Sequence, residues 1–284
     1  MTTSVKVKPA ALVDAKLSVV MPVYSETDSV RAIVAWLVDQ LGARLREIIL
    51  VLSPHSDHSS RDTCFGLAGA DARVRVHVQE ENPGLGRAIR EGIERTRGEF
   101  VLLMDSDGEM ENGTILPMLE EMSTGRYGLV IASRWCGGGG FVGYSPVKLV
   151  LNWCFQHLFR VLFGTRLHDL TYGFKLMRGE VARGIAWEGS MHEIACETTL
   201  KPIRLGVSAT EVPSRWTKRS QGHTKNTFVR NFRYLFMALR ILIFGGAGHC
   251  CRWGPVAESP RASRQSRLCR EGLTHAHVEA ARFS

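Results

Sequence analysis

The 284-residue sequence contains seven cysteines but no CxxC pair, so it lacks the usual signature of a zinc-binding or thiol-redox motif. An odd, scattered set of cysteines is typical of proteins in reducing compartments, and we therefore expect a protein that faces the cytosol. No G-x-G-x-x-G turn follows the first predicted strand, which excludes a dinucleotide-binding oxidoreductase of the usual kind. A sugar nucleotidyltransferase would carry a Gly-rich, Arg-bearing loop at the same turn, and the sequence there is PVYSE.

Long apolar runs are also scarce. Residues 1–16 are polar and contain lysines, so we interpret them as an N-terminal extension without a signal peptide. Segments 147–163 and 232–244 are strongly apolar, but both are too short and too charged to span a bilayer. Each segment is predicted to form a helix that either lies in the membrane interface or packs in the protein core, and the sequence leaves both interpretations open.

Hydrophobic periodicity disappears after residue 244, where Gly, Pro, Ser and Arg dominate. We therefore predict a poorly ordered tail over 245–284. The remaining chain divides into one domain over 17–231 and a membrane-proximal helix over 232–244.

The net charge of +8 is concentrated in one block. Residues 201–244 contain nine Lys and Arg against the single acid Glu211, a surplus of eight. Such a block can bind nucleic acid, anionic lipid or a phosphorylated ligand, or it can be a solvated face. It contains no motif of a known nucleic-acid-binding module, so we expect no nucleic-acid partner.

Short apolar runs alternate with segments of helical period. Strands are predicted over 17–24, 47–52, 74–78, 100–104 and 129–132, and helices over 28–41, 84–97 and 114–122. This alternation predicts an α/β fold with a Rossmann-like, mostly parallel sheet flanked by helices. Ligands of such sheets bind beyond the carboxyl ends of the strands, where Tyr24, Leu52 and Asp105 fall.

Three acids directly follow the strand predicted over 100–104. Asp105, Asp107 and Glu109 are spaced two residues apart, so in an extended segment their carboxylates point to one side. Hard oxygen ligands on one face suit Mg²⁺ or Mn²⁺, with phosphate oxygens filling the remaining positions. An acid-rich surface turn is the alternative interpretation of this pattern.

Six motifs occur along the chain in a fixed order: VMPVYSE (20–26), NPGLGRA (82–88), LMDSD (103–107), ASRW (132–135), HDLTYGFK (168–175) and EVP…R-x-x-G-x-x-K (211–225). Together they resemble family 2 glycosyltransferases of the GT-A fold, in particular the branch of the dolichol-phosphate mannose synthases and polyprenyl-phosphate glycosyltransferases. The resemblance covers residues 17–225. It implies an inverting hexosyltransferase that uses a nucleotide sugar and a divalent metal.

The resemblance also implies roles for individual residues. Metal ligands would be Asp105, Asp107 and Glu109, and catalytic residues would be Asp107, Arg134 and Lys175. Donor contacts would come from Pro22, Tyr24, Glu26, Asp57, Gly84, Gly86, Arg87, Asp105 and Asp169. Gly84 and Gly86 would let the backbone approach the donor, and the helix that follows would present its N-terminus to phosphate. Glu197 could be a buried partner of one of the site cations.

The acceptor is predicted from the absence of a general base. A hydroxyl acceptor needs a base to remove its proton, whereas a phosphate acceptor is already ionised at pH 7 and needs positioning. No separate base is evident, and basic residues are abundant. We therefore predict a polyprenyl phosphate acceptor held by Arg134, Arg219 and Lys225, and a peripheral enzyme on the cytoplasmic face of a membrane.

One motif of the family is altered. The family usually has V-D-D-G-S-x-D after its second strand, and here Leu52 and Ser53 replace the acidic pair while Asp57 is present. The nucleotide and sugar therefore stay open. Two alternatives also stay open: a family 2 enzyme that acts on a hydroxyl of a cell-envelope glycan, and a non-catalytic module that binds nucleotide sugars.

Overall fold

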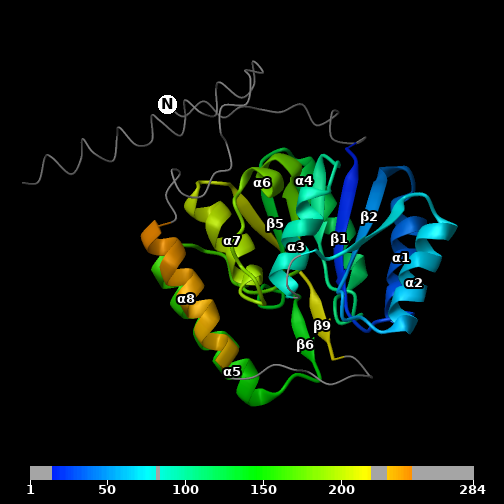
Figure 1. The fold of residues 1–284 in the computed structure, drawn as a ribbon. Helices are drawn as coiled ribbons and strands as arrows, with labels where there is room; N and C mark the ends of the chain where they lie inside the picture. The colour runs from blue at the N-terminus through cyan, green and yellow to red at the C-terminus, as the bar shows by residue number, and fades with distance from the viewer. Residues whose placement is uncertain (1–14, 81–83, 219–228, 245–284) are drawn as a thin grey trace, which may run out of the picture.

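A computed structural model describes residues 15–80, 84–218 and 229–244 of the chain, with backbone alone at 229–231 (Figure 1). The strands are β1 Leu17–Val23, β2 Leu45–Leu52, β3 Val74–Val78, β4 Phe100–Leu103, β5 Leu129–Ser133, β6 Gly140–Val142, β7 Lys175–Arg178, β8 Ala209–Pro213 and β9 Arg215–Thr217. The helices are α1 Asp28–Leu41, α2 His58–Ala70, α3 Leu85–Glu94, α4 Ile115–Ser123, α5 Pro146–Phe163, α6 Gly179–Gly184, α7 Ile194–Arg204 and α8 Val229–Phe244. Residues 1–14 of the extension predicted over 1–16, and the whole predicted tail over 245–284, lie outside the described residues.

The central sheet has seven strands in the order β3-β2-β1-β4-β7-β5-β8. Its neighbours pair in parallel, except that β7 is antiparallel to both β4 and β5. The predicted mostly parallel sheet is therefore confirmed. Because β7 runs the opposite way, its first residue, Lys175, lies beside Leu103 and Ile131 near the carboxyl ends of β4 and β5.

Helices cover both faces of the sheet (Figure 1). One core joins alternate residues of β1 to α1 and α4, and it includes all five apolar positions of α1 that the helical period predicted: Val30, Ile33, Val34, Leu37 and Leu41. The other core joins Val20 and Ile49 to α3, α6 and α7 and to the inner sides of α5 and α8. Each face thus has its own apolar layer, as the alternation of side chains along a strand requires.

The sequence left open whether the two apolar segments pack in the core or lie in a membrane interface, and the structure answers part of this question. Both bury one side and expose another: Phe159 of α5 and Ala238 of α8 are fully buried, whereas Val161 and Phe236 are 80% and 69% exposed. The helices α5 and α8 contact each other and lie on the same side of the molecule (Figure 1). None of the described helices combines the length and the apolar character that crossing a membrane demands.

The packing of α3 on the sheet depends on a glycine. A Cβ atom at Gly92 would lie 2.3 Å from Cγ1 of Val20 and 3.0 Å from Cγ2 of Val51, so any larger residue overpacks this contact. We expect Gly92→Val to lower the free energy of unfolding by about 1–3 kcal/mol in a denaturant titration.

Gly66 on α2 is the matched control, because a Cβ there would meet no atom within 4 Å. Gly66→Ala is expected to raise the stability by about 0.5–1 kcal/mol, as alanine does in place of a helical glycine. Equal stability changes for the two variants would contradict the close packing of α3 on β1.

Candidate active site

The three predicted metal ligands lie in the loop that follows β4, at the edge of the sheet where the parallel strands end. Two hydrogen bonds shape this loop: the Ser106 hydroxyl donates to the Pro22 carbonyl (2.6 Å), and the Glu109 amide donates to Oδ1 of Asp107 (3.0 Å). The acidic loop is therefore attached to the end of β1, and the predicted donor segment 20–26 adjoins it.

Several carboxylates interact electrostatically at this edge of the sheet. The pKa of Asp105 is raised from its ordinary value of 3.8 to about 7, first by burial and then by the charges of Asp107, Glu109 and Glu26. The charge of Lys175 acts in the opposite direction. Carboxylates that repel one another in this way are stabilised by a divalent cation, and their hard oxygen atoms suit Mg²⁺ or Mn²⁺. The residues present therefore fit the metal that the resemblance implies.

The end of β1 supplies two further predicted donor residues. The Glu26 carboxylate accepts hydrogen bonds from the amides of Tyr24 (2.8 Å) and Ser25 (3.0 Å), which fixes the turn after the strand. The Tyr24 side chain is 46% exposed. The turn thus carries an exposed aromatic residue next to Glu26, whose charge acts on Asp105.

Asp169, a predicted donor residue, is fully buried as the partner of Arg134. Its carboxylate accepts from the Arg134 amide (3.1 Å), from Nε (2.7 Å) and from Nη2 (2.9 Å), and also from Nε2 of Gln156 (3.2 Å). The Glu211 carboxylate, in the EVP motif, accepts the amides of His168 and Asp169. Asp169 is therefore a positioning residue for Arg134.

The Arg134 guanidinium lies between two aromatic rings, with Cζ 4.3 Å from the centre of Tyr172 and 5.1 Å from that of Phe141. Among the described residues, its Nη1 makes no hydrogen bond, so the N–H groups of this nitrogen remain for a ligand. The guanidinium is thus oriented and charged, and its pKa is raised above its already high ordinary value by Asp169 despite burial.

Lys175, a predicted catalytic residue, has its hydrogen-bond partners in α7. It is fully buried, and Nζ donates to the Ala195 carbonyl and to the Thr198 hydroxyl (3.0 Å) in α7. Burial lowers the pKa of Lys175 to about 7. The side chain points toward α7 because Lys175 lies opposite Leu103, which belongs to the same apolar layer as α7. The motif alone does not reveal this direction. The charge of Lys175 in turn acts to lower the pKa of Asp105.

The N-terminus of α3, where the sequence predicts a phosphate site, packs against the 189–190 segment. The amides of Gly86 and Arg87 donate to the Ser190 carbonyl, at 3.1 and 3.4 Å. A Cβ atom at Gly84 or Gly86 would lie 2.4 Å from a carbonyl oxygen of the 189–190 segment. The glycines are therefore required for helix–loop packing. Asn82 and Pro83 of the same motif lie outside the described residues.

Three other predictions have different outcomes. The Asp57 carboxylate accepts the Ser60 amide (2.8 Å), so Asp57 caps α2, a helix that the sequence did not predict. Glu197 is buried as expected, but it pairs with Lys201 (2.5 Å) and not with one of the predicted site cations. Arg219 and Lys225 lie outside the described residues.

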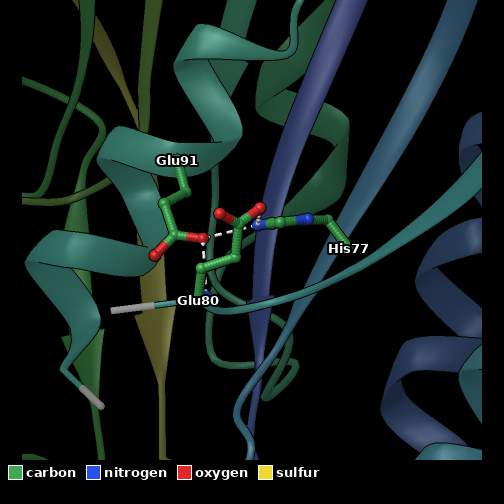
Figure 2. A group of neighbouring side chains, drawn as sticks. All are labelled: His77, Glu80 and Glu91. Atoms are coloured by element: carbon green, nitrogen blue, oxygen red, sulfur yellow. Dashed lines mark hydrogen bonds and ion pairs between the residues drawn. The ribbon is translucent and has the colours of Figure 1, made fainter. Parts of the chain in front are cut away.

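A polar network stands beside the predicted donor motif, at the end of β3. Figure 2 shows His77 of β3 and Glu91 of α3 pointing toward each other with Glu80 next to them, and Nε2 of His77 lies 2.5 Å from Oε2 of Glu91. Glu80 donates its amide to Glu91 (3.0 Å), and its carboxylate pairs with Arg95 (2.6 Å). These groups satisfy one another, so we assign the network a structural role in joining α3 to β3.

Sequence reasoning missed Tyr172, Gln156 and Trp216. Gln156 had a signal, since it is one of few polar residues in the apolar segment 147–163, and it faces inward to Asp169. Tyr172 had a weaker signal, because it stands where the family motif has serine. Trp216 had none.

The chain matches the family model described as Glycosyl transferase family 2 over residues 18–185. It is 29% identical over 214 residues to the undecaprenyl-phosphate mannosyltransferase of Micrococcus luteus, covering 72% of this chain and 85% of that protein. It is 30% identical over 214 residues to the polyprenol monophosphomannose synthase of Mycolicibacterium smegmatis, covering 73% and 79%.

Among solved structures, the glucosyl-3-phosphoglycerate synthase of Mycobacterium tuberculosis, in complex with Mn²⁺, UDP-glucose and phosphoglyceric acid, is similar with a TM-score of 0.60. The sequences are 19% identical, and the match covers 84% of this chain and 81% of that one. This likeness confirms the predicted GT-A fold.

The raised pKa of Asp105 predicts a pH dependence of stability. An acid whose pKa is higher in the folded protein stabilises it at low pH, and this contribution is lost as the pH rises from about 4 through about 7. We expect Asp105→Asn, which carries no charge, to raise the Tm of the metal-free protein relative to wild type, and to do so more at pH 8 than at pH 5. Thermal unfolding in EDTA at both pH values measures the effect.

Asp39→Asn, at an exposed position on α1, is the control and should follow the wild type at both pH values. If Asp105→Asn shows the same pH dependence as that control, the charge of Asp105 does not oppose folding.

Proposed function

Because this chain belongs to glycosyltransferase family 2, we propose that it transfers a sugar from a nucleotide-sugar donor to a polyprenyl phosphate. The observation that carries the proposal is the group of carboxylates at Asp105, Asp107 and Glu109, which lies at the ligand-binding edge of the sheet with the pKa of Asp105 strongly raised. Relatives that use polyprenyl phosphates support the acceptor class.

The acids would hold Mg²⁺ or Mn²⁺ together with the donor diphosphate. When bound, the cation offsets the negative charge that develops on the departing nucleoside diphosphate. A bound cation would lower the pKa of Asp105, because it would offset the charges of the neighbouring carboxylates. Lys175, buried beneath the site, adds positive charge from a distance.

The donor nucleoside would lie against the end of β1, where Pro22, Tyr24 and Glu26 form one wall. Its base stays unassigned, because Leu52 is buried in the apolar core and the Ser53 hydroxyl accepts the His55 amide. These residues replace the acidic pair of the family.

The acceptor phosphate would be held by Arg134. Asp169 and the rings of Tyr172 and Phe141 orient the guanidinium, and a phosphate can accept the N–H groups of Nη1. Arg219 and Lys225 remain part of this proposal on the strength of their motif. A phosphate oxygen is ionised at pH 7, so it can attack the sugar without a general base.

The outer sides of α5 and α8 fit a membrane surface. Val147, Val150 and Val161 of α5 and Phe236 and Ile243 of α8 are 61–80% exposed. Lys148 of α5 and Arg233 of α8 are exposed beside them. Apolar side chains with flanking cations are the composition of an interfacial helix on an anionic leaflet. We place this face on the cytoplasmic leaflet, where the lipid phosphate would meet Arg134.

A donor panel tests the activity directly. GDP-mannose, UDP-glucose, UDP-GlcNAc and dTDP-sugars are each incubated with the protein, Mn²⁺ and a polyprenyl phosphate, and release of nucleoside diphosphate is measured. We expect release from one donor class, dependent on the metal, and a loss of about 100-fold or more in Asp107→Ala, since charge stabilisation at the leaving group is removed. Asp62→Ala, outside the predicted site, is the control.

Release with a hydroxyl acceptor but not with a polyprenyl phosphate would replace the acceptor that we propose. Absence of release from every donor, with and without metal, would refute the transferase activity and favour a non-catalytic sugar-nucleotide-binding module.

Sedimentation with vesicles tests the membrane surface. We expect the double variant Val161→Ser, Phe236→Ser to bind vesicles of phosphatidylglycerol and phosphatidylcholine at least about tenfold more weakly than wild type, because two exposed apolar side chains that would enter the lipid are removed. Phe65→Ser is the matched control, since Phe65 is 51% exposed on α2, outside the proposed surface. Equal binding of all three proteins would exclude α5 and α8 as the docking face.

A further inference from the structure

Strand β9 fixes the third acid of the site. The indole N–H of Trp216 donates to Oε2 of Glu109 (3.0 Å), and the Thr217 amide donates to the Glu109 carbonyl (3.0 Å). An isolated bridge also joins Met110 to Trp216. Both the backbone and the carboxylate of Glu109 are therefore held by two neighbouring residues of one short strand.

Trp216 is also the first ring of an aromatic series that leads to Arg134. Its ring meets Tyr144 edge-on (5.0 Å, 86°), Tyr144 packs on Phe141 (4.8 Å), and Phe141 faces the Arg134 guanidinium (5.1 Å). The pairing of β6 with β9 supports the series, because Phe141 lies opposite Trp216 in the register. One set of contacts thus joins a predicted metal ligand to the predicted acceptor cation.

The geometry of this contact resembles the outer shell of a metal site. A glutamate side chain has three rotatable bonds, and a hydrogen bond to one carboxylate oxygen restricts how it presents itself to a cation. Partners of this kind, which hold a ligand without touching the metal, typically contribute about 10- to 100-fold to metal affinity.

We propose that Trp216 is a positioning residue of the metal site, which orients Glu109 toward the divalent cation through its indole N–H. The inference rests on the proposed function, since it takes Asp105, Asp107 and Glu109 as the metal ligands. It adds a residue that lies 107 positions further along the chain, and it links cation binding to β9, the strand that follows the EVP motif of β8.

Mn²⁺ binding in the absence of donor tests this role without reference to turnover. The dissociation constant is measured by electron paramagnetic resonance of free Mn²⁺, for wild type and for Trp216→Phe, which keeps an aromatic ring and removes the N–H. We expect binding about tenfold weaker in the variant. The rise in Tm on adding Mn²⁺ should shrink correspondingly, which gives a second measure if the variant is less stable overall.

Trp135→Phe is the matched control. The Trp135 indole N–H donates to Oδ1 of Asn152 (2.9 Å), and its ring packs on Phe141 (5.0 Å), so the same substitution removes the same kind of hydrogen bond elsewhere in the aromatic series. Its affinity for Mn²⁺ should equal that of wild type. An equal weakening in both tryptophan variants would overturn the specific role of Trp216.

A double-mutant cycle distinguishes the role of Trp216 from the proposed metal site itself. Glu109→Gln should weaken Mn²⁺ binding, and adding Trp216→Phe to it should cause no further loss. If Glu109→Gln weakens binding while Trp216→Phe alone does not, Trp216 has no positioning role and the metal site stands. If neither Glu109→Gln nor Asp107→Ala changes Mn²⁺ binding, the metal site itself is wrong, and the inference falls with it.

Discussion

The buried ion pair between Arg134 and Asp169 is the interaction on which the site depends. Asp169 has no exposed surface, and its charge is compensated by the Arg134 amide and guanidinium and by Gln156. Removal of one partner from such a pair leaves an uncompensated charge and typically costs about 3–5 kcal/mol. The pair joins the end of β5 to the segment that leads into β7, and Gln156 adds α5. Three parts of the chain therefore share one electrostatic centre.

Much of the fold was predictable because it follows from local patterns. The strands over 17–24, 74–78 and 100–104 and the five inward positions of α1 agree with the structure, since apolar periodicity reports burial directly. The four-residue strand β7 escaped this reasoning, because KLMR has no distinctive period. Its direction follows from pairing with β4 and β5, which only the folded chain determines. The position of the acidic loop at the end of β4 was also predictable, because its carboxylates directly follow this strand in the sequence.

Several residues of the family motifs have partners within the protein for a common physical reason. Lys175, Asp169 and Gly86 were expected to touch ligands because of their motifs, and the structure assigns each of them a partner within the protein. A motif reveals that a residue type is required, but it does not tell whether a ligand or another segment requires it. These partners, Thr198, Arg134 and Ser190, lie 23 to 104 residues away in sequence, and Trp216 lies 107 residues from Glu109. No local pattern could therefore identify them.

The rotation of α5 about its own axis determines both which residues contact the protein and which residues face outward. Asn152, Gln156 and Phe159 recur at the spacing of one helix face and contact the protein, and Val147, Val150 and Val161 recur on the other side. Since an α-helix turns about 100° per residue, one inserted residue would turn every later side chain by that angle. The rotation of α5 about its axis is therefore fixed, because the hydrogen bond from Gln156 to Asp169 also determines which residues of the helix face outward. Insertions or deletions in α5 are compatible with the site only if they return the later side chains to the same side of the helix. This requirement constrains the length of the helix more strictly than its composition.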